Sequence, residues 1–277
     1  MSKGISLHLG LNAVDPNGYG GWGGPLVACE NDARDMQAIA KKQGFTPTVL
    51  LTKDATSKNA IAAIKAAAAA LKKGDTFIIS YSGHGGQVPD TNHDEADGYD
   101  ETWCLYDRQL IDDELYGLWA KFAEGVRIFV LSDSCHSGTV LRDMPPMILV
   151  KHVTGEYNYS ALTKRAMPLA IRDAAFQAQK KTYVDAQKKY AEGDATKVKA
   201  AVVLISGCQD NQTSADGAKN GLFTQNLLDV WNKGKFKGSL HDFQKLIKQR
   251  MPAVQSPNYY AVGTKNPKFE ASRPFTV

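Results

Sequence analysis

The sequence predicts an α/β fold in which a mainly parallel central β-sheet is flanked by helices on both faces. Apolar, β-branched runs alternate with helical patterns along the 277 residues, as they do in βαβ units. Residues 76–80 and 127–132 are almost continuously apolar, which is typical of strands covered on both faces. The Ala-rich segment 57–71 places its larger apolar side chains on one face of a helix.

Residues typical of helix ends help to place the elements along the chain. Asn31 or Asp32 is expected as the N-cap of the first helix, and Gly44 lies just beyond its end. Ser239 and Asp242 resemble a capping box at the start of a later helix. In chain order, the expected elements are a strand at 5–11, a helix at 31–42, a strand at 46–51, a helix at 57–71, strands at 76–80, 127–132 and 202–206, helices at 222–233 and 239–250, and a last strand at 259–262.

The chain divides into three parts of what we expect to be one domain. Residues 1–143 and 201–277 are expected to share one sheet, and residues 144–200 form a long, Lys-rich insert whose pattern fits one or two helices. Residues 151–200 hold ten Lys or Arg against five Asp or Glu. A solvated helical connection is one interpretation of this basic segment, and a cleavable linker is the other. The positive charge is too diffuse to indicate a nucleic-acid partner.

The composition, at 43% hydrophobic and 22% charged, is that of an ordinary soluble globular protein. No apolar run reaches the roughly eighteen residues that cross a bilayer, and the N-terminus lacks a signal-peptide pattern. The four cysteines are scattered without metal-binding spacing, so we expect reduced thiols and a cytoplasmic location. The sequence also lacks the Gly-rich patterns of nucleotide sites, which argues against a nucleotide- or flavin-binding protein.

Two Gly-flanked motifs follow predicted strands and carry the strongest functional signal. Residues 81–85 read YSGHG, and residues 133–138 read DSCHSG. Because the carboxyl ends of parallel strands meet at one edge of a sheet, His84 and Cys135 are expected to meet there as base and nucleophile. Taken alone, His84 is better explained as a loop histidine and Cys135 as a buried thiol. Together, in matching positions after two strands, they favour the functional interpretation. His136 is the rival base.

These motifs resemble those of the caspase–metacaspase superfamily of cysteine peptidases, and those of metacaspases and their bacterial relatives more than those of animal caspases. His84 lies 51 residues before Cys135, as in that superfamily. The resemblance includes residues 29–33 and 205–216 and covers about 200 residues, in the order of a type I metacaspase. It implies a caspase-like fold and cleavage after Arg or Lys. His84 is then the base, Cys135 the nucleophile, and the amide of Gly85 part of the oxyanion site.

A basic side chain at P1, the substrate residue before the cleaved bond, needs an acidic pocket. The positions that match the family's pocket are Asp32, Asp133 and Asp210, with a hydroxyl from Ser82 and a second cysteine at Cys29. Asp32 is also explained as a helix N-cap, and Cys29 as a buried thiol. Asp133 lies two residues before the nucleophile and has few structural explanations, so its charge is expected to pair with substrate.

Acidic residues cluster between the two motifs and just after the second. Carboxylates that converge from several loops suit Ca²⁺, a hard cation that prefers oxygen ligands. The resemblance implies an activating Ca²⁺ at Asp100, Asp112, Asp113 and Asp143. Arg142 is an unfavourable neighbour for that cation, and a solvated acidic loop is the alternative interpretation.

We therefore predict a Ca²⁺-activated cysteine endopeptidase that acts on proteins or peptides with Arg or Lys at P1. The resemblance favours a monomer, and we expect no membrane or nucleic-acid partner. A catalytically silent scaffold with the same fold is the alternative function. The Gly-rich residues 18–25 are either a flap near the site or a long loop. Self-processing is a further prediction, with candidate sites in the linker at Lys151, Lys164–Arg165, Lys180–Lys181 and Lys188–Lys189.

Overall fold

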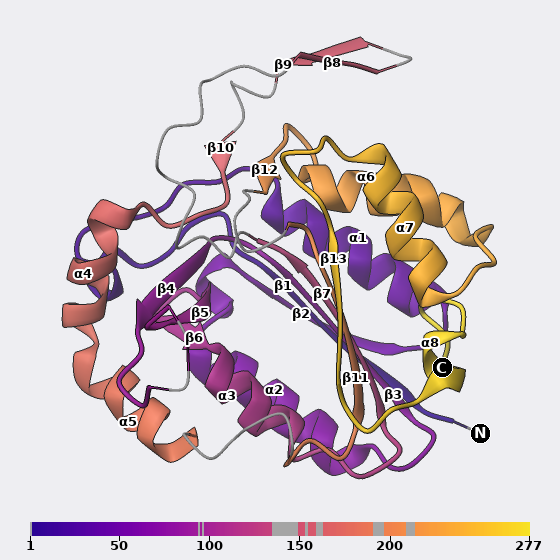
Figure 1. The fold of residues 1–277 in the computed structure, drawn as a ribbon, viewed down its shortest axis with the longest axis horizontal. Coiled ribbons are helices and arrows are strands. Elements are labelled where there is room, and N and C mark those ends of the chain that lie inside the picture. The colour runs from indigo at the N-terminus through magenta and orange to yellow at the C-terminus, as the bar shows by residue number, and fades with distance from the viewer. Residues whose placement is uncertain are drawn as a thin grey trace.

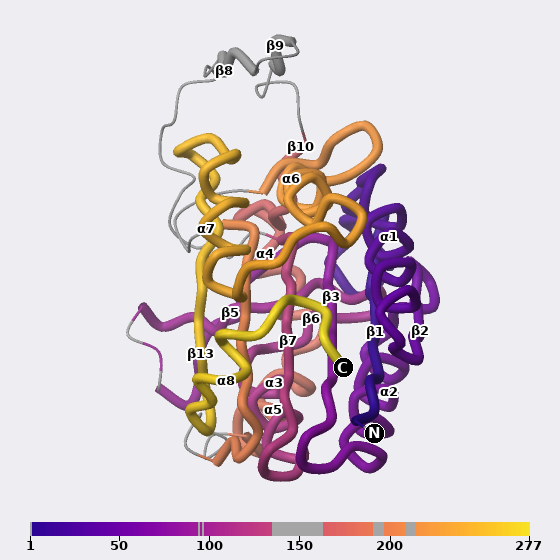
Figure 2. Tube along the Cα trace, turned by 90° about the vertical axis from the view of Figure 1, so that its right-hand side faces the viewer, coloured from indigo at the N-terminus to yellow at the C-terminus, as the bar shows by residue number. Residues whose placement is uncertain are grey.

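A six-stranded sheet forms the centre of the structure (Figure 1), a computed structural model that describes residues 2–93, 95, 97–134, 149–152, 155–158, 163–190, 197–208 and 214–277. The strand order is β13-β11-β7-β3-β1-β2, and Figure 2 shows these strands succeeding one another across the molecule. All are parallel except β13, which is antiparallel at one edge, so the predicted fold class is confirmed. The strands are β1 (Gly4–Gly10), β2 (Thr46–Leu51), β3 (Thr76–Ser82), β7 (Arg127–Asp133), β11 (Ala201–Ser206) and β13 (Asn258–Gly263).

Helices cover both faces of this sheet (Figure 1). The helices α1, α6 and α7 pack on one face, and α2 and α3 pack on the other. None of the helices in the described part of the chain is both long and apolar enough to cross a membrane. The helices are α1 (Cys29–Lys42), α2 (Ser57–Ala70), α3 (Asp112–Trp119), α4 (Leu169–Ala178), α5 (Lys180–Tyr190), α6 (Leu222–Trp231), α7 (Leu240–Arg250) and α8 (Pro267–Glu270).

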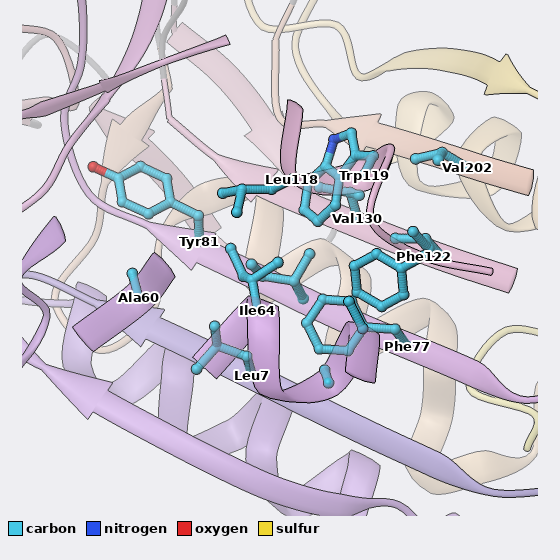
Figure 3. Close-up of a cluster of buried hydrophobic side chains, with 14 of the residues drawn as sticks. Leu7, Ala60, Ile64, Phe77, Tyr81, Leu118, Trp119, Phe122, Val130 and Val202 are labelled. Atoms are coloured by element: carbon cyan, nitrogen blue, oxygen red, sulfur yellow. The ribbon is translucent and has the colours of Figure 1, made fainter. Parts of the chain in front are cut away.

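The alternation of side chains along β3 explains the two apolar layers. Phe77, Ile79 and Tyr81 belong to the cluster that includes Ile64 of α2 (Figure 3). Ile78 lies in the opposite cluster, with apolar side chains of α1, α6 and α7. Because a strand turns successive side chains to opposite faces, a strand buried on both faces requires a continuous apolar run. The runs noted in the sequence have this origin.

Most predicted elements agree with the observed ones, and the differences have local causes. The strand β2 has the predicted bounds, the predicted capping box opens α7, and Gly44 follows α1 with a φ of +88°. The prediction of Asn31 or Asp32 as an N-cap is wrong, because α1 begins at Cys29 after the cap residue Ala28. The carboxylate of Asp32 therefore does not cap the helix and can contact groups at the edge of the sheet.

A small antiparallel sheet beside the main one was not predicted. It consists of β4 (Gly85–Pro89), β5 (Tyr99–Cys104) and β6 (Gln109–Ile111), and α3 follows directly. Of the predicted Ca²⁺ ligands, Asp100 thus lies on β5, and Asp112 and Asp113 lie on α3 rather than in loops. Asp100 is only 1% exposed. Shorter pairs of strands complete the structure: β8 (Leu149–His152) with β9 (Gly155–Asn158), and β10 (Thr163–Lys164) with β12 (Ala215–Asp216).

The linker forms two helices, α4 and α5, as the sequence pattern allows, and they lie against the small sheet (Figure 1). Phe176 and Tyr183 pack with Val88 of β4 and Ile111 of β6. Gln187 is fully buried, and its side-chain amide donates a 2.8 Å hydrogen bond to the carbonyl of Pro89. The C-terminal part of the linker is therefore anchored to the body of the protein.

Candidate active site

The two motifs end neighbouring strands at one edge of the main sheet. The strands β3 and β7 pair in a register that sets Ser82 opposite Asp133. His84 follows two residues after Ser82 and is 4% exposed. The strand ends thus place the proposed base beside part of the proposed pocket.

His84 is held as a neutral imidazole with one free nitrogen. Its Nε2 lies 3.0 Å from the carbonyl oxygen of Gly24, which only accepts hydrogen bonds, so Nε2 carries the proton. Its Nδ1 is buried and has no hydrogen-bond partner among the residues that the structure describes. Burial lowers the pKa of His84 to about 4, although the Gly24 carbonyl acts in the opposite direction. The unprotonated Nδ1 is therefore available as a base.

The Gly-rich segment 18–25 lies at this site. The ring of Trp22 contacts His84 with a centroid distance of 4.7 Å. Gly24 has a φ of +49°, and a Cβ there would lie 2.9 Å from Trp22 and 3.1 Å from the His84 ring. A glycine is thus required where the chain passes the base. Sequence reasoning placed a flap or a loop here but did not identify the carbonyl that orients His84.

A hydrogen bond from Tyr81 holds the backbone of His84 in place. The Tyr81 hydroxyl donates to the carbonyl of His84 at 2.6 Å, and its ring stacks on Trp103 at 4.7 Å. The amide of Cys104 donates to the same His84 carbonyl at 3.0 Å. These buried contacts therefore fix the backbone position of His84.

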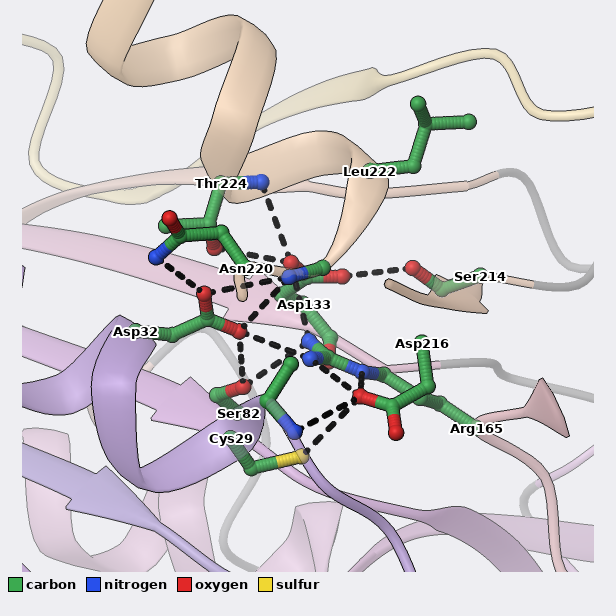
Figure 4. A network of polar contacts seen from close by, with 12 residues as sticks. Cys29, Asp32, Ser82, Asp133, Arg165, Ser214, Asp216, Asn220, Leu222 and Thr224 are labelled. Atoms are coloured by element: carbon green, nitrogen blue, oxygen red, sulfur yellow. Dashed lines mark hydrogen bonds and ion pairs between the residues drawn. The ribbon is translucent and has the colours of Figure 1, made fainter. Parts of the chain in front are cut away.

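The side chain of Arg165, from the linker, occupies the predicted acidic pocket (Figure 4). Its Nη2 lies 2.7 Å from Asp32 Oδ2, and its Nη1 lies 2.9 Å from Asp133 Oδ2. Nη1 also donates to Ser82 Oγ at 2.8 Å. Arg165 is 0% exposed, and the described residues that balance its charge are buried carboxylates. The structure brings Asp32, Ser82 and Asp133 together around a guanidinium.

Asp216 completes this pocket, although sequence reasoning did not assign it there. Its Oδ1 accepts from Arg165 Nε at 3.2 Å and from Nη2 at 2.9 Å. The backbone amides of Val27 and Ala28 donate to the same carboxylate at 2.8 and 3.3 Å. Asp216 is the last residue of the segment 205–216 that carried the family resemblance, and this position was the available signal.

Donors from the C-terminal part of the chain hold the pocket carboxylates in place. Asp133 accepts hydrogen bonds from the Ser214 hydroxyl, and from the Thr224 amide and hydroxyl at 3.0 and 2.7 Å. Asp32 accepts from the Asn220 side chain at 2.9 Å. The pocket is therefore preorganised by residues that follow the linker as well as by residues that precede it.

The main chain around Arg165 crosses the site in an extended form. Its amide donates to the Ser214 carbonyl at 2.9 Å, and β10 pairs with β12 just before it. The amide of Gly85 donates to the Arg165 carbonyl at 3.0 Å, and the amide of Met167 donates to the Gly85 carbonyl at 2.8 Å. The Arg165 carbonyl thus contacts the amide expected to stabilise an oxyanion. The linker thus pairs through its backbone with the sheet edge on both sides of Arg165.

The comparisons with known proteins agree with this geometry. The sequence profile of the caspase domain matches residues 13–275. The chain belongs to the caspase-domain family of cysteine peptidases. It is 34% identical to Metacaspase-1 of Mycosarcoma maydis over 81% of this chain and 60% of that protein. It is 33% identical to Metacaspase-1 of Schizosaccharomyces pombe over 81% of this chain and 58% of that protein. The chain thus spans about 60% of the length of these two relatives.

Solved structures share the fold of this caspase-domain chain. The crystal structure of a Geobacter sulfurreducens protein superposes with a TM-score of 0.88 at 55% sequence identity, over 99% of both chains. Caspase-1 of Spodoptera frugiperda superposes with a TM-score of 0.53 at 10% identity, over 95% of this chain and 86% of the other. The second likeness shows the fold alone.

Burial and charge shift the titration of the groups in the caspase-domain pocket. Burial raises the pKa of Asp32 to about 6, although Arg165 acts in the opposite direction. Burial alone would lower the pKa of the Arg165 guanidinium, but Asp133, Asp32 and Asp216 hold it well above its usual value. Burial also raises the pKa of the Cys29 thiol, whose sulfur lies 4.0 Å from Asp216. Cys29 is therefore a protonated thiol that lines the pocket.

Three residues predicted for the caspase-domain site lie outside the described residues. They are the nucleophile Cys135, the pocket residue Asp210 and the metal ligand Asp143. Their neighbours Ser134 and Cys208 are described, and Cys208 Sγ lies 3.2 Å from the Ser134 carbonyl. The segments that lead into Cys135 and Asp210 therefore lie next to each other at the same edge of the sheet.

The three described residues predicted to bind Ca²⁺, Asp100, Asp112 and Asp113, lie on β5 and at the start of α3. The carboxylates of Asp112, Glu95 and Glu101 place oxygens within 4.8 Å of one another. Asp100 instead accepts a hydrogen bond from Gln187 of the linker, and Asp113 accepts one from Asn92 at 3.1 Å. Burial and the nearby carboxylates raise the pKa of Asp112 well above its usual value. The structure thus gathers around Asp112 two glutamates that the sequence reasoning did not select.

Proposed function

We propose that this protein is a cysteine endopeptidase that cleaves after arginine or lysine. The observation that supports this most directly is the buried Arg165 guanidinium between Asp32, Asp133 and Asp216, with its carbonyl on Gly85. A neutral P1 side chain would leave three buried carboxylates without a cation, which is unfavourable. A basic P1 side chain is therefore favoured over acidic and apolar ones.

The proposed reaction uses His84 in both of its steps. Nδ1 of His84 takes the thiol proton of Cys135, and the thiolate attacks the carbonyl carbon of the P1 residue. The resulting oxyanion accepts a hydrogen bond from the Gly85 amide. His84 then gives the proton to the leaving amine, and the acyl-enzyme forms. Water hydrolyses the thioester, with His84 as the base, and the thiol is restored.

Hydrolysis of fluorogenic peptides tests the activity and the P1 preference together. We expect cleavage after Arg and Lys but not after Asp, and loss of all cleavage in Cys135→Ala. The peptides share every residue except P1, so that the difference reports the pocket alone. Preference for Asp, or undiminished cleavage by Cys135→Ala, would contradict the proposal.

We further propose that the enzyme processes itself between Arg165 and Ala166. Of the candidate sites in the linker, Arg165 is buried in the acidic pocket with its carbonyl on Gly85. Lys181, another candidate, has an 89% exposed side chain that pairs with Asp185. Until this bond is cleaved, Arg165 excludes other substrates from the pocket. The uncleaved chain is then an inactive precursor.

Mass spectrometry of the purified full chain tests this self-processing. We expect one fragment that ends at Arg165 and one that begins at Ala166, and neither in Cys135→Ala. Because the bond already lies in the site of its own chain, the rate constant should not change with protein concentration. A cut at Lys181 instead, or a rate constant that rises with protein concentration, would contradict the proposed intramolecular cleavage.

We also propose that Ca²⁺ activates the enzyme by binding at the acidic residues around Asp112. The donor set fits a hard cation, because Asp112, Glu95 and Glu101 offer carboxylate oxygens close together. Burial, and after it the nearby carboxylates, raise the pKa of Asp112, and a divalent cation would neutralise the negative charge gathered there. Calorimetric titration of Ca²⁺ into Cys135→Ala measures binding without self-cleavage. Binding that is unchanged in Asp112→Asn would place the cation elsewhere.

A further inference from the structure

We infer that Asp216 makes this pocket select arginine over lysine at P1. The inference rests on the proposed function, and it narrows the substrate class from basic residues to arginine. It starts from the way in which the three carboxylates divide the nitrogens of Arg165 among themselves (Figure 4).

Asp32 and Asp133 contact only the terminal nitrogens of the guanidinium. Asp32 lies against Nη2 at 2.7 Å, and Asp133 lies against Nη1 at 2.9 Å. Asp216 Oδ1 instead accepts from Nε at 3.2 Å and from Nη2 at 2.9 Å. Of these three carboxylates, Asp216 is thus the one that accepts a hydrogen bond from Nε, the nitrogen within the side chain.

A lysine in the same position lacks the group that Asp216 reads. The fourth side-chain atom is Nε in arginine but a methylene carbon in lysine, so a buried carboxylate would face carbon. The single lysine nitrogen would follow at the place of the guanidinium carbon, one bond short of Nη1 and Nη2. Arginine offers five donors in a fixed plane, whereas lysine offers three donors from one point. Lysine therefore leaves Asp216 poorly paired in a buried site.

Asp216 is not free to move toward a shorter cation. The amides of Val27 and Ala28 donate to its carboxylate at 2.8 and 3.3 Å, just before α1 begins. Its side chain is only 1% exposed, and its backbone pairs with Thr163 in the register of β12 and β10. A carboxylate fixed from two sides discriminates by geometry, because it cannot adapt to the wrong substrate.

A double-mutant cycle on the intact chain tests the inference. The rate of self-processing is measured by mass spectrometry in the wild type, Arg165→Lys, Asp216→Asn and the double variant. We expect Arg165→Lys to slow the wild type by about 10–100-fold, the range for lost hydrogen bonds to charged groups. The same change should slow Asp216→Asn by much less, because the discriminating carboxylate is already gone.

Control variants separate this role from a structural one. If Asp216 only supported the start of α1, Asp216→Asn would slow the native and Arg165→Lys chains alike, and the inference would be overturned. Asp35→Asn is the matched control, because Asp35 lies one helical turn beyond Asp32 and accepts from Asn220 at 2.9 Å. Arg165→Lys should slow self-processing by the same factor in the Asp35→Asn background as in the wild type. An equal loss of discrimination there would assign the effect to general charge.

Peptide substrates distinguish a failure of the inference from a failure of the proposed function. After processing, the wild type should cleave an Arg peptide with a higher kcat/KM than the matching Lys peptide, and Asp216→Asn should reduce this ratio. A wild type that cleaves both peptides equally overturns the role of Asp216 alone. A wild type that cleaves neither peptide and leaves its linker intact overturns the proposed function, and this inference with it.

Discussion

At the residue scale, the charge balance around Arg165 connects folding with function. Three buried carboxylates surround one buried guanidinium, and each contacts it directly. An unpaired buried charge costs several kcal/mol, so the folded chain needs a cation in this pocket. Arg165 of the linker supplies that cation in the structure. Under the proposed function, a basic substrate side chain supplies it after self-processing, so the same electrostatic demand would stabilise the precursor and select the substrate.

The raised pKa of Asp32 predicts how the activity of the processed enzyme depends on pH. Burial raises this pKa to about 6 even with a guanidinium in the pocket, and it rises further when the cation leaves. Substrate binds the ionised form, so kcat/KM for an Arg peptide should fall as the pH decreases through a value above about 6. In the complex the guanidinium keeps Asp32 ionised to lower pH, so kcat should fall only near pH 6.

Initial rates between pH 4.5 and 8 measure both of these profiles. Because burial lowers the pKa of His84 to about 4, the imidazole stays neutral over most of this range. Profiles of kcat and kcat/KM that both stay flat down to about pH 5 would mean that His84, and not Asp32, controls the acid side. The predicted separation of the two limbs is thus a signature of the pocket.

At the element scale, the sequence predicts the strands that carry the site better than the contacts between them. The runs before Ser82 and Asp133 are apolar enough to identify buried strands, and the motifs at their ends indicate the chemistry. Asp216 was missed because β12 is only two residues long and forms by pairing with the linker strand β10. The small sheet was missed because its strands are short and mix polar and apolar residues without a clear period. Such elements depend on tertiary packing, which local sequence patterns do not encode.

The position of β11 predicts what happens to the two fragments after cleavage at Arg165. This strand belongs to the C-terminal fragment and lies between β7 of the other fragment and β13. The linker helices add Phe176 and Tyr183, both buried against the small sheet. We therefore expect the fragments to elute together in native size-exclusion chromatography and to separate only in denaturant. Separate elution without denaturant would show that the intact peptide bond after Arg165 is needed to hold the sheet together.

At the scale of the whole molecule, a buried histidine of the main sheet couples stability to pH. His8 of β1 is fully buried, and its ring nitrogens lie 2.8 Å from Ser80 Oγ and 3.0 Å from Ser6 Oγ. Burial lowers its pKa from 6.5 to about 3. Below pH 6.5 the unfolded chain binds a proton at this residue that the folded chain does not bind, so stability decreases as the pH falls. The loss from this residue alone is about 2 kcal/mol between pH 6.5 and 5.

Chemical denaturation of Cys135→Ala and of the same chain with His8→Gln isolates this contribution. The Cys135→Ala background prevents self-cleavage, and the other shifted groups titrate alike in both proteins. Asp32 acts in the opposite direction, because its raised pKa lets the folded chain gain a proton as the pH falls. It cancels when the two proteins are compared. We expect the difference in free energy of unfolding to shrink by about 2 kcal/mol from pH 6.5 to 5. A constant difference would mean that His8 is protonated without cost inside the folded sheet.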